Sequence, residues 1–84
     1  MIIIAESGST KTNWLTEGRE LHETIGFNPL FYSSDDIHNE MMKHSGLVAL
    51  RSKVTAVYFY GASCSSDDRK QTVRVAMAKF FTNA

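Results

Sequence analysis

The chain of 84 residues has one cysteine and no excess of charge of either sign. A single cysteine excludes a disulfide within the chain and, without a Cys/His cluster, argues against a structural zinc site. Nine basic and nine acidic side chains cancel, whereas proteins that bind nucleic acid or membrane surfaces usually carry a charge excess. The longest apolar run, Val54 to Ala62, is far too short to span a bilayer. We therefore expect neither nucleic acid nor a membrane as a partner.

The first residues carry no basic leader or long apolar segment, so no signal peptide is expected and a cytoplasmic protein is the default. Apolar residues make up 43% of the chain, which is enough for a core and argues against disorder. The length suits one small domain or a piece of a larger one. We treat residues 1–84 as a single domain.

The N-terminal stretch predicts a β-hairpin. Ile2–Ala5 is apolar and rich in β-branched residues, which is typical of a buried strand. After Glu6 the chain breaks into small and polar residues around Gly8, and Thr12–Thr16 has the character of the return strand. On that strand Trp14 and its neighbour point to opposite faces, so at least one of them should pack against a helix or another domain.

The composition of the hairpin loop suits an anion-binding site. Gly8 permits close approach, and the loop offers backbone N–H groups and hydroxyls. Lys11 adds a positive charge, and Glu6 stands where a carboxylate could hold hydrated Mg²⁺. The alternative is an ordinary polar turn, because loops are commonly rich in Gly and Ser. It is not a Walker P-loop, since the second Gly-Lys is missing and a strand follows. The three hydroxyls belong to Ser7, Ser9 and Thr10.

The segment Ile4–Trp14 resembles the first phosphate motif of the actin-like ATPase and sugar-kinase superfamily. It is most similar to the branch of N-acetylglucosamine kinases and BadF/BadG/BcrA/BcrD-type ATPases. Gly26–Pro29 and Val57–Cys64 agree with the same branch, so the resemblance runs through nearly all of the chain. It covers only the beginning of the family's two-domain fold. The second phosphate motif, the adenosine motif and the catalytic aspartate would lie beyond Ala84.

The resemblance implies an ATP-dependent kinase that uses Mg²⁺ and transfers a phosphoryl group to an amino sugar similar to N-acetylglucosamine. Glu6 would contact the metal through water. Asn28 would bind the sugar, together with Gly61 and Ala62. No catalytic base is visible, so the isolated chain is expected to be inactive. The nucleotide phosphates would be bound by the loop residues Ser7, Gly8, Ser9, Thr10 and Lys11.

The next segment predicts a third strand and a break. Glu20–Ile25 alternates with a period of two, which completes an antiparallel meander. Gly26–Pro29 then ends it, because Pro29 cannot donate to a ladder. The Asn28 amide suits a sugar hydroxyl or acetamido group. An equally simple alternative is that Asn28 caps a turn.

The middle of the chain predicts a helix that begins near Asp35, with Ser33 or Ser34 as its cap. Gly46 should end this segment, and Leu47–Leu50 should cover the sheet in a further turn or loop. Three histidines, which share no helix face, are interpreted as surface residues rather than metal ligands. These are His22, His38 and His44.

Val54–Tyr60 is nearly all apolar, the pattern of a central strand covered on both faces, and should lie parallel to the first strand. A last helix should follow, capped by Ser65 and reaching about Phe81. Lone Cys64, before that helix, is interpreted as structural rather than nucleophilic. The predicted buried stripe of the helix is Val73, Ala76, Met77, Phe80 and Phe81.

The predicted fold is therefore α/β: a three-stranded antiparallel meander plus a parallel fourth strand, with two helices. This agrees with the ribonuclease-H-like core that the resemblance implies, incomplete relative to the family. Three loops should open on the same edge of the sheet, which favours one shared site. They are Ser7–Lys11, Gly26–Pro29 and Gly61–Ser65.

Two alternatives to the kinase reading stay open. A BadF-type activator ATPase would need cysteines for an iron–sulfur cluster, and Cys64 supplies no pair. A non-catalytic interaction domain would keep the fold without the chemistry. In the ribonuclease-H-like order a fifth strand normally covers the fourth, and the sequence up to Ala84 offers none, so we expect Val54–Tyr60 to be an exposed edge. It lacks the Pro, Lys and Glu that discourage pairing, so it could cause self-association.

Overall fold

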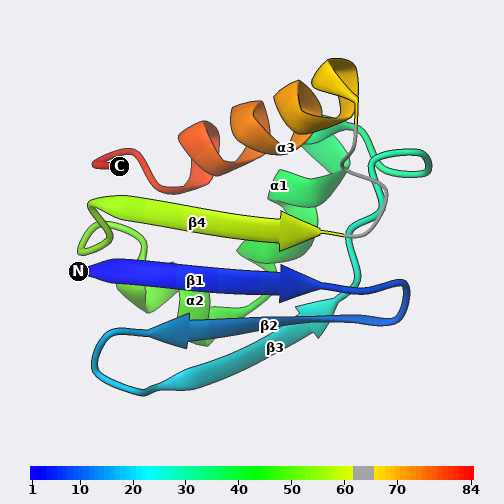
Figure 1. Cartoon of the computed structure of the whole chain (residues 1–84). Coiled ribbons are helices and arrows are strands. Elements are labelled where there is room, and N and C mark those ends of the chain that lie inside the picture. Colours follow the sequence, from blue (N-terminus) through cyan, green and yellow to red (C-terminus); the bar gives the residue numbers. More distant parts are fainter. Residues whose placement is uncertain (62–65) are drawn as a thin grey trace.

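The computed structural model describes residues 1–61 and 66–84. In chain order its elements are β1 (Ile2–Ser7), β2 (Lys11–Thr16), β3 (Leu21–Ile25), α1 (Ser34–Met42), α2 (Ser45–Leu50), β4 (Ala56–Gly61) and α3 (Asp67–Phe80). The first three strands form an antiparallel meander, and β4 pairs with β1 in parallel, which gives the order β3-β2-β1-β4 (Figure 1). The predicted α/β fold class is confirmed.

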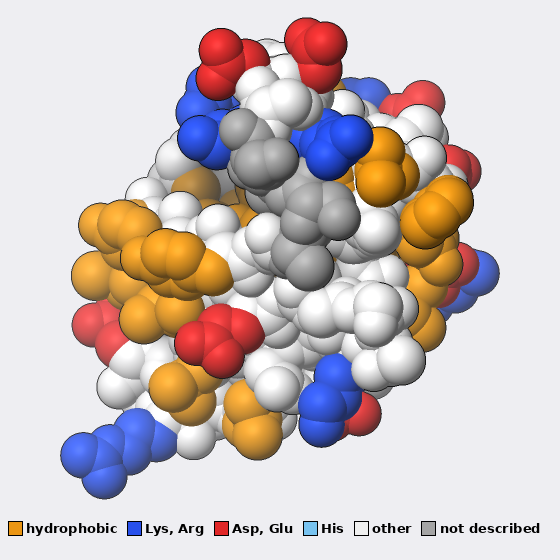
Figure 2. All heavy atoms as spheres, turned by 45° about the vertical axis from the view of Figure 1, so that its right-hand side comes forward, with side chains coloured by type: hydrophobic (Ala, Val, Ile, Leu, Met, Phe, Trp, Pro, Cys, Tyr) orange, Lys and Arg blue, Asp and Glu red, His pale blue; other side chains and the backbone are white. Residues whose placement is uncertain are grey.

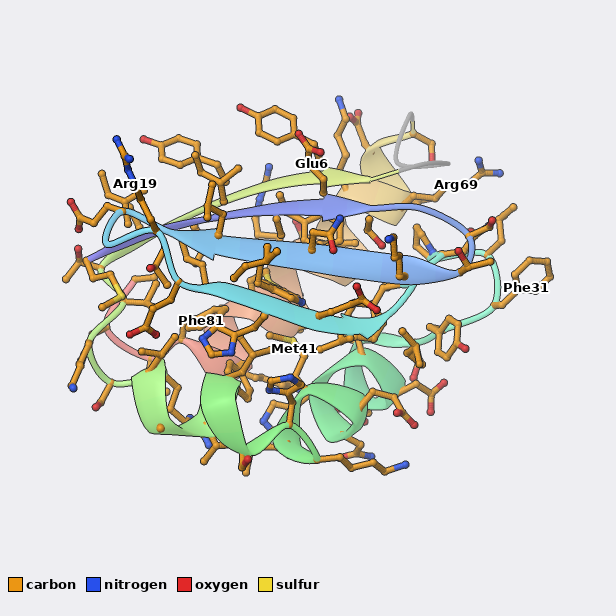
Figure 3. All side chains as sticks on the ribbon, turned by 90° about the horizontal axis from the view of Figure 1, so that it is seen from below. Glu6, Arg19, Phe31, Met41, Arg69 and Phe81 are labelled. Carbon is orange, nitrogen blue, oxygen red and sulfur yellow. The ribbon has the colours of Figure 1, made fainter. Side chains whose placement is uncertain are left out.

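The helices cover one face of the sheet and leave the other face open (Figure 3). Side chains alternate accordingly: Ile3 and Trp14 are fully buried on the helix side, whereas Ile4 and Leu15 are 42% and 43% exposed on the open side. The prediction that Trp14 and its neighbour point to opposite faces is confirmed. In the described residues the fold therefore has two layers, the sheet and the helices. The apolar outer face of the sheet is not covered by any helix of these residues.

Trp14 lies at the centre of the core. Its ring contacts Phe27, Phe59 and Phe81, with centroid separations of 6.4, 6.1 and 6.0 Å. Its Nε1–H donates to Thr24 Oγ1 at 3.0 Å, so the indole is satisfied as well as buried. The predicted stripe of the last helix, including Phe81, is buried against this centre.

The two longer helices begin as their sequences indicate. Ser33 caps α1, and its side chain and that of Asp36 form a reciprocal capping box. The cap of α3 is Ser66, whose side chain accepts from the N–H of Arg69. The predicted cap, Ser65, lies outside the described residues, and the helix is capped one position later.

Two predictions about the middle of the chain are wrong. Gly46 does not end a helix but lies inside α2, and Leu47–Leu50 is helical rather than a loop. The helix forms because His44 Nδ1 accepts from the N–H of Leu47 at 3.2 Å, which caps it, and because Leu47 and Leu50 are buried. Histidine is not an obvious cap, so the pattern did not indicate this start.

The expected exposed edge at the last strand is found in the described sheet, whereas the coverage on both faces that its apolar run indicates is not. The strand begins at Ala56, and β4 has only β1 as a neighbour in the described sheet. Its side chains on the open face, Tyr58 and Tyr60, are 51% and 63% exposed. A strand with a continuous apolar run is buried on both faces only where helices cover both faces of the sheet. In the described residues the helices cover only one face.

The histidines are half-buried rather than on the surface. The rings of His22 and His44 lie perpendicular with centroids 5.5 Å apart, and His38 lies edge-on to Phe80 at 6.2 Å. A Cβ at Gly46 would lie 2.6 Å from His22 Nδ1, so α2 approaches β3 closely at this point. The ring pair thus joins α2 to the sheet.

Polar contacts join the helices to one another. Lys79 Nζ of α3 donates to Asp35 Oδ1 of α1 at 2.6 Å, and this hydrogen bond together with the ammonium charge lowers the pKa of Asp35. Arg51, at the end of α2, donates from Nε to the carbonyl of Phe80 at 3.0 Å.

In the part of the chain that the structure describes, no helix has the length and apolar character needed to cross a bilayer.

Candidate functional site

The candidate site is an open hollow. It lies at the end of the sheet where β1 and β4 finish, the right-hand end in Figure 1. Its volume is about 610 Å³, within the usual range of ligand pockets. Parallel strands present their carboxyl ends there, which is where α/β sheets commonly bind ligands. The lining residues are Glu6, Ser7, Gly8, Ser9, Thr10, Lys11, Asn13, Tyr60 and Gly61.

The hairpin loop lines one side of the hollow and offers free donors. Gly8 N–H donates to the carbonyl of Lys11 at 2.9 Å, which closes the turn. Ser9 and Thr10 are exposed, and among the described residues their amides and hydroxyls have no hydrogen-bond partner. Unpaired N–H groups that point from a tight turn into solvent are suited to bind a phosphate or another anion.

Ser7 has a structural role in this arrangement. Thr12 Oγ1 donates to the carbonyl of Ile25 at 2.9 Å, so the hydroxyl of Ser7 donates to Thr12 Oγ1 at 2.7 Å. Ser7 Oγ in turn accepts from the buried N–H of Phe27 at 2.9 Å. This series of bonds ties the loop after β3 to the hairpin. The Ser7 hydroxyl is therefore used within the chain, although Ser7 also lines the hollow, and its predicted role in binding phosphate stays a prediction.

The loop after β3 also lies directly against the hairpin loop. A Cβ built at Gly26 would overlap the carbonyl oxygen of Gly8 and lie 2.8 Å from the carbonyl carbon of Ser9. Since Gly26 does not have a positive φ, glycine is needed for this close approach rather than for its conformational freedom. Two of the three loops predicted to share an edge are thus in contact. The third begins at Gly61, which pairs with Ser7 across the sheet.

The predicted sugar residues are placed less favourably. Asn28 Oδ1 accepts from the N–H of Leu30 at 2.9 Å, and the Asn28 carbonyl accepts from the N–H of Phe31. The side chain therefore caps a turn, the alternative left open above, and only its amino group stays free among the described residues. Asn28 does not line the hollow. Gly61 does, and Ala62 lies outside the described residues.

Glu6 extends from the open face into the hollow (Figure 3). The strand register places it between Asn13 on β2 and Tyr60 on β4, so three oxygen-bearing side chains lie in one row. Neither neighbour was predicted as a site residue. The cross-strand register indicates both, but the sequence alone does not fix which residues pair across the strands.

The charges at the hollow are few and exposed. Lys11 Nζ lies 3.9 Å from Glu23 Oε2, and both side chains are well exposed, so the pair is weak and leaves the ammonium group available. Within residues 1–61 and 66–84, no three Asp, Glu, His or Cys side chains gather around a point that could hold a metal ion. Glu6 alone fits a metal that keeps its waters and takes its remaining ligands from a bound phosphate.

We expect Ser7→Ala to destabilise the protein by about 1–3 kcal/mol, because the buried N–H of Phe27 loses its acceptor. Urea unfolding monitored by circular dichroism measures this. Ser9→Ala is the matched control in the same loop, and since its hydroxyl is exposed it should change the free energy of unfolding by less than about 0.5 kcal/mol. Equal effects of the two variants would show that the series of bonds through Ser7 contributes nothing.

Comparison with known proteins supports a kinase relationship in part. No family model matches the chain, and no curated protein matches it. Among solved structures it is similar to a protein from Porphyromonas gingivalis described as a putative N-acetylglucosamine kinase, with a TM-score of 0.80 and 32% identity. The match covers 100% of this chain but 31% of that protein.

The chain has the fold of the N-terminal piece of that neighbour, whose fold is actin-like. Because it spans about a third of the neighbour's length, the similarity supports a sugar-kinase-like segment and does not extend to a whole active site. The hollow described above is the part of such a site that this segment could contribute.

Proposed function

We propose that the chain is the phosphate-binding segment of an ATP-dependent sugar kinase that resembles N-acetylglucosamine kinase. The observation that carries this proposal is the hairpin loop, whose unpaired Ser9 and Thr10 donors open into the same hollow as Glu6. Phosphoryl transfer depends mainly on positioning and on neutralising charge, and a loop of this kind contributes to both. The Porphyromonas gingivalis protein supports the kinase class.

The residues have separate roles in the proposal. The amides of Gly8–Thr10 and the Thr10 hydroxyl bind nucleotide phosphates, and Lys11 adds positive charge. Glu6 holds Mg²⁺ through water, and the metal neutralises charge on the phosphates. Asn28, beyond the loop contact, and Gly61, at the hollow itself, bind the amino sugar, and Ala62 belongs to the same predicted set.

Among the described residues, Glu6 is the single carboxylate that lines this hollow, and the proposal assigns it to Mg²⁺. No second carboxylate is therefore placed there to take a proton from a sugar hydroxyl. We therefore expect no sugar-dependent ATP turnover by the chain alone. A cytoplasmic location, where ATP is available, is part of the same proposal.

Binding of Mg²⁺·ATP to the purified chain tests the proposal without requiring turnover. We expect ¹H–¹⁵N NMR shifts confined to residues 6–13 and 60–61, with at least tenfold weaker binding in Thr10→Ala, which removes a donor. Glu6→Gln should abolish the dependence on Mg²⁺ and leave ATP binding without metal unchanged. Thr82→Ala, exposed near the C-terminal end, is the control and should bind as the unchanged chain does.

Three results would contradict the proposal. Shifts spread over the whole chain, or binding that Thr10→Ala leaves unchanged, would mean that the loop is an ordinary turn. The interaction-domain alternative would then be favoured. Turnover of ATP with N-acetylglucosamine by the chain alone, above a Thr10→Ala control, would show that the chain is a complete enzyme.

A further inference from the structure

Asn13 on β2 is a direct neighbour of Glu6 on the open face of the sheet. The antiparallel register pairs the two residues, and Trp14 beside Asn13 is fully buried on the helix side, so Asn13 shares the open face with Glu6. Residues paired in this way have Cβ atoms about 4.5–5.5 Å apart, which lets both side chains reach one bound group. Asn13 is half-buried and lines the same hollow.

The fold does not use the Asn13 side chain. Among the described residues its amide has no hydrogen-bond partner, and the Glu6 carboxylate has neither a hydrogen bond nor an ion pair. The Ser7 hydroxyl, by contrast, is bonded to Thr12 within the chain. An asparagine amide carries an acceptor oxygen and two donors. Two adjacent polar groups without partners therefore line the hollow in which the proposed nucleotide site lies.

The charges on the two sides of Asn13 differ. Glu23 on β3 is its other cross-strand neighbour, and Lys11 Nζ lies 3.9 Å from the Glu23 carboxylate. Glu6 has no such cation among the described residues, so it is the carboxylate left to hold a metal. Figure 2, which brings the loop end of the sheet forward, shows acidic side chains spread over that face rather than gathered in one patch. The neutral Asn13 therefore adds no further negative charge beside Glu6.

We propose that Asn13 is a positioning residue for the metal: its Oδ1 accepts a hydrogen bond from a water of the hydrated Mg²⁺ that Glu6 holds. The inference rests on the proposed function, which assigns Glu6 to the metal. Magnesium sites in proteins usually keep several waters, so an amide one strand away from the carboxylate has a water to bind. Groups that contact a metal through its ligands orient those ligands and affect the affinity.

The neutrality of Asn13 has its own consequence. A carboxylate at position 13 would attract a cation more strongly, but it would also repel the phosphates of a nucleotide bound without metal. The amide binds the water and adds no charge. Asn13 thus leaves the cation dependent on the phosphates for most of its attraction, so that metal and nucleotide enter the hollow together.

Mn²⁺, a paramagnetic substitute for Mg²⁺, tests the inference without nucleotide. Broadening of ¹H–¹⁵N NMR peaks should centre on Glu6 and its strand neighbours and gives the affinity. Asn13→Ala should bind Mn²⁺ about tenfold more weakly, with an unchanged urea unfolding curve because the amide has no partner in the chain. Asn13→Asp should bind Mn²⁺ about tenfold more tightly and ATP without metal more weakly. Leu21→Asp adds the same charge on the same face outside the hollow, and it should change neither affinity.

The inference is overturned if Asn13→Ala binds Mn²⁺ as the unchanged chain does. It is also overturned if Leu21→Asp tightens binding as much as Asn13→Asp, since net charge alone would then decide the affinity, or if neither the unchanged chain nor Asn13→Asp shows broadening near Glu6. Failure of the proposed function gives a different result. The chain would then bind no Mg²⁺·ATP, while Mn²⁺ would still broaden the Glu6 peak and Asn13→Ala would still weaken that binding.

Discussion

Gly26→Ala is expected to separate the two loops at the candidate site and to destabilise the protein by about 3 kcal/mol, near the upper end of typical overpacking costs. The new methyl group would overlap the Gly8 carbonyl oxygen and crowd the backbone of Ser9 and Lys11. All three contacts are with backbone, so no side chain can rotate away to relieve them. Urea unfolding gives the free energy of unfolding, and NMR shifts of residues 8–11 report the loop.

The same substitution at Gly18 is the matched control. There a Cβ would meet only Thr16 Oγ1 at 3.7 Å, an ordinary contact, and the turn lies at the opposite end of the sheet. Gly18→Ala should therefore keep both stability and Mg²⁺·ATP binding, whereas Gly26→Ala should lose binding even where the chain stays folded. If both variants bind ATP equally, the contact between the loops is not needed for the site.

The strands and the long helices could be predicted because each has a pattern that its surroundings do not alter. The alternation of Trp14 and Leu15 fixes which side of β2 is buried, and Ser33 with Asp36 forms the cap that the residues indicate. The helix α2 could not be predicted in this way. It depends on a histidine cap and on His22 from a strand distant in sequence, and such a contact is decided by tertiary packing.

The candidate site could be predicted at the level of loops but not of side chains. The strand directions bring the loops to one edge, as expected. Which hydroxyls are free depends on hydrogen bonds across the sheet, and that of Ser7 is bonded to Thr12 and to the N–H of Phe27. Asn28 is likewise used by its own turn. The partners of short polar side chains are local or cross-strand, and a sequence pattern does not distinguish the two.

The last prediction concerns the centre of the fold. Trp14→Ala should destabilise the chain by about 3–5 kcal/mol, the usual cost of deleting a large buried aromatic residue. Trp14 is fully buried, and it joins the loop after β3, strand β4 and the end of α3 through Phe27, Phe59 and Phe81. A domain of this size has a total stability of about 4–13 kcal/mol. The variant should therefore unfold at a clearly lower temperature than the unchanged chain.

Leu15→Ala is the control from the adjacent position on the open face. Leu15 is 43% exposed, so its loss should cost less than about 1 kcal/mol, and circular dichroism melting curves should leave the two variants far apart. If Leu15→Ala is as damaging as Trp14→Ala, the open face must already be covered in solution. The sheet would then have a second layer, formed by another copy or by a bound partner, and the isolated two-layer fold would not be the state in which the chain exists.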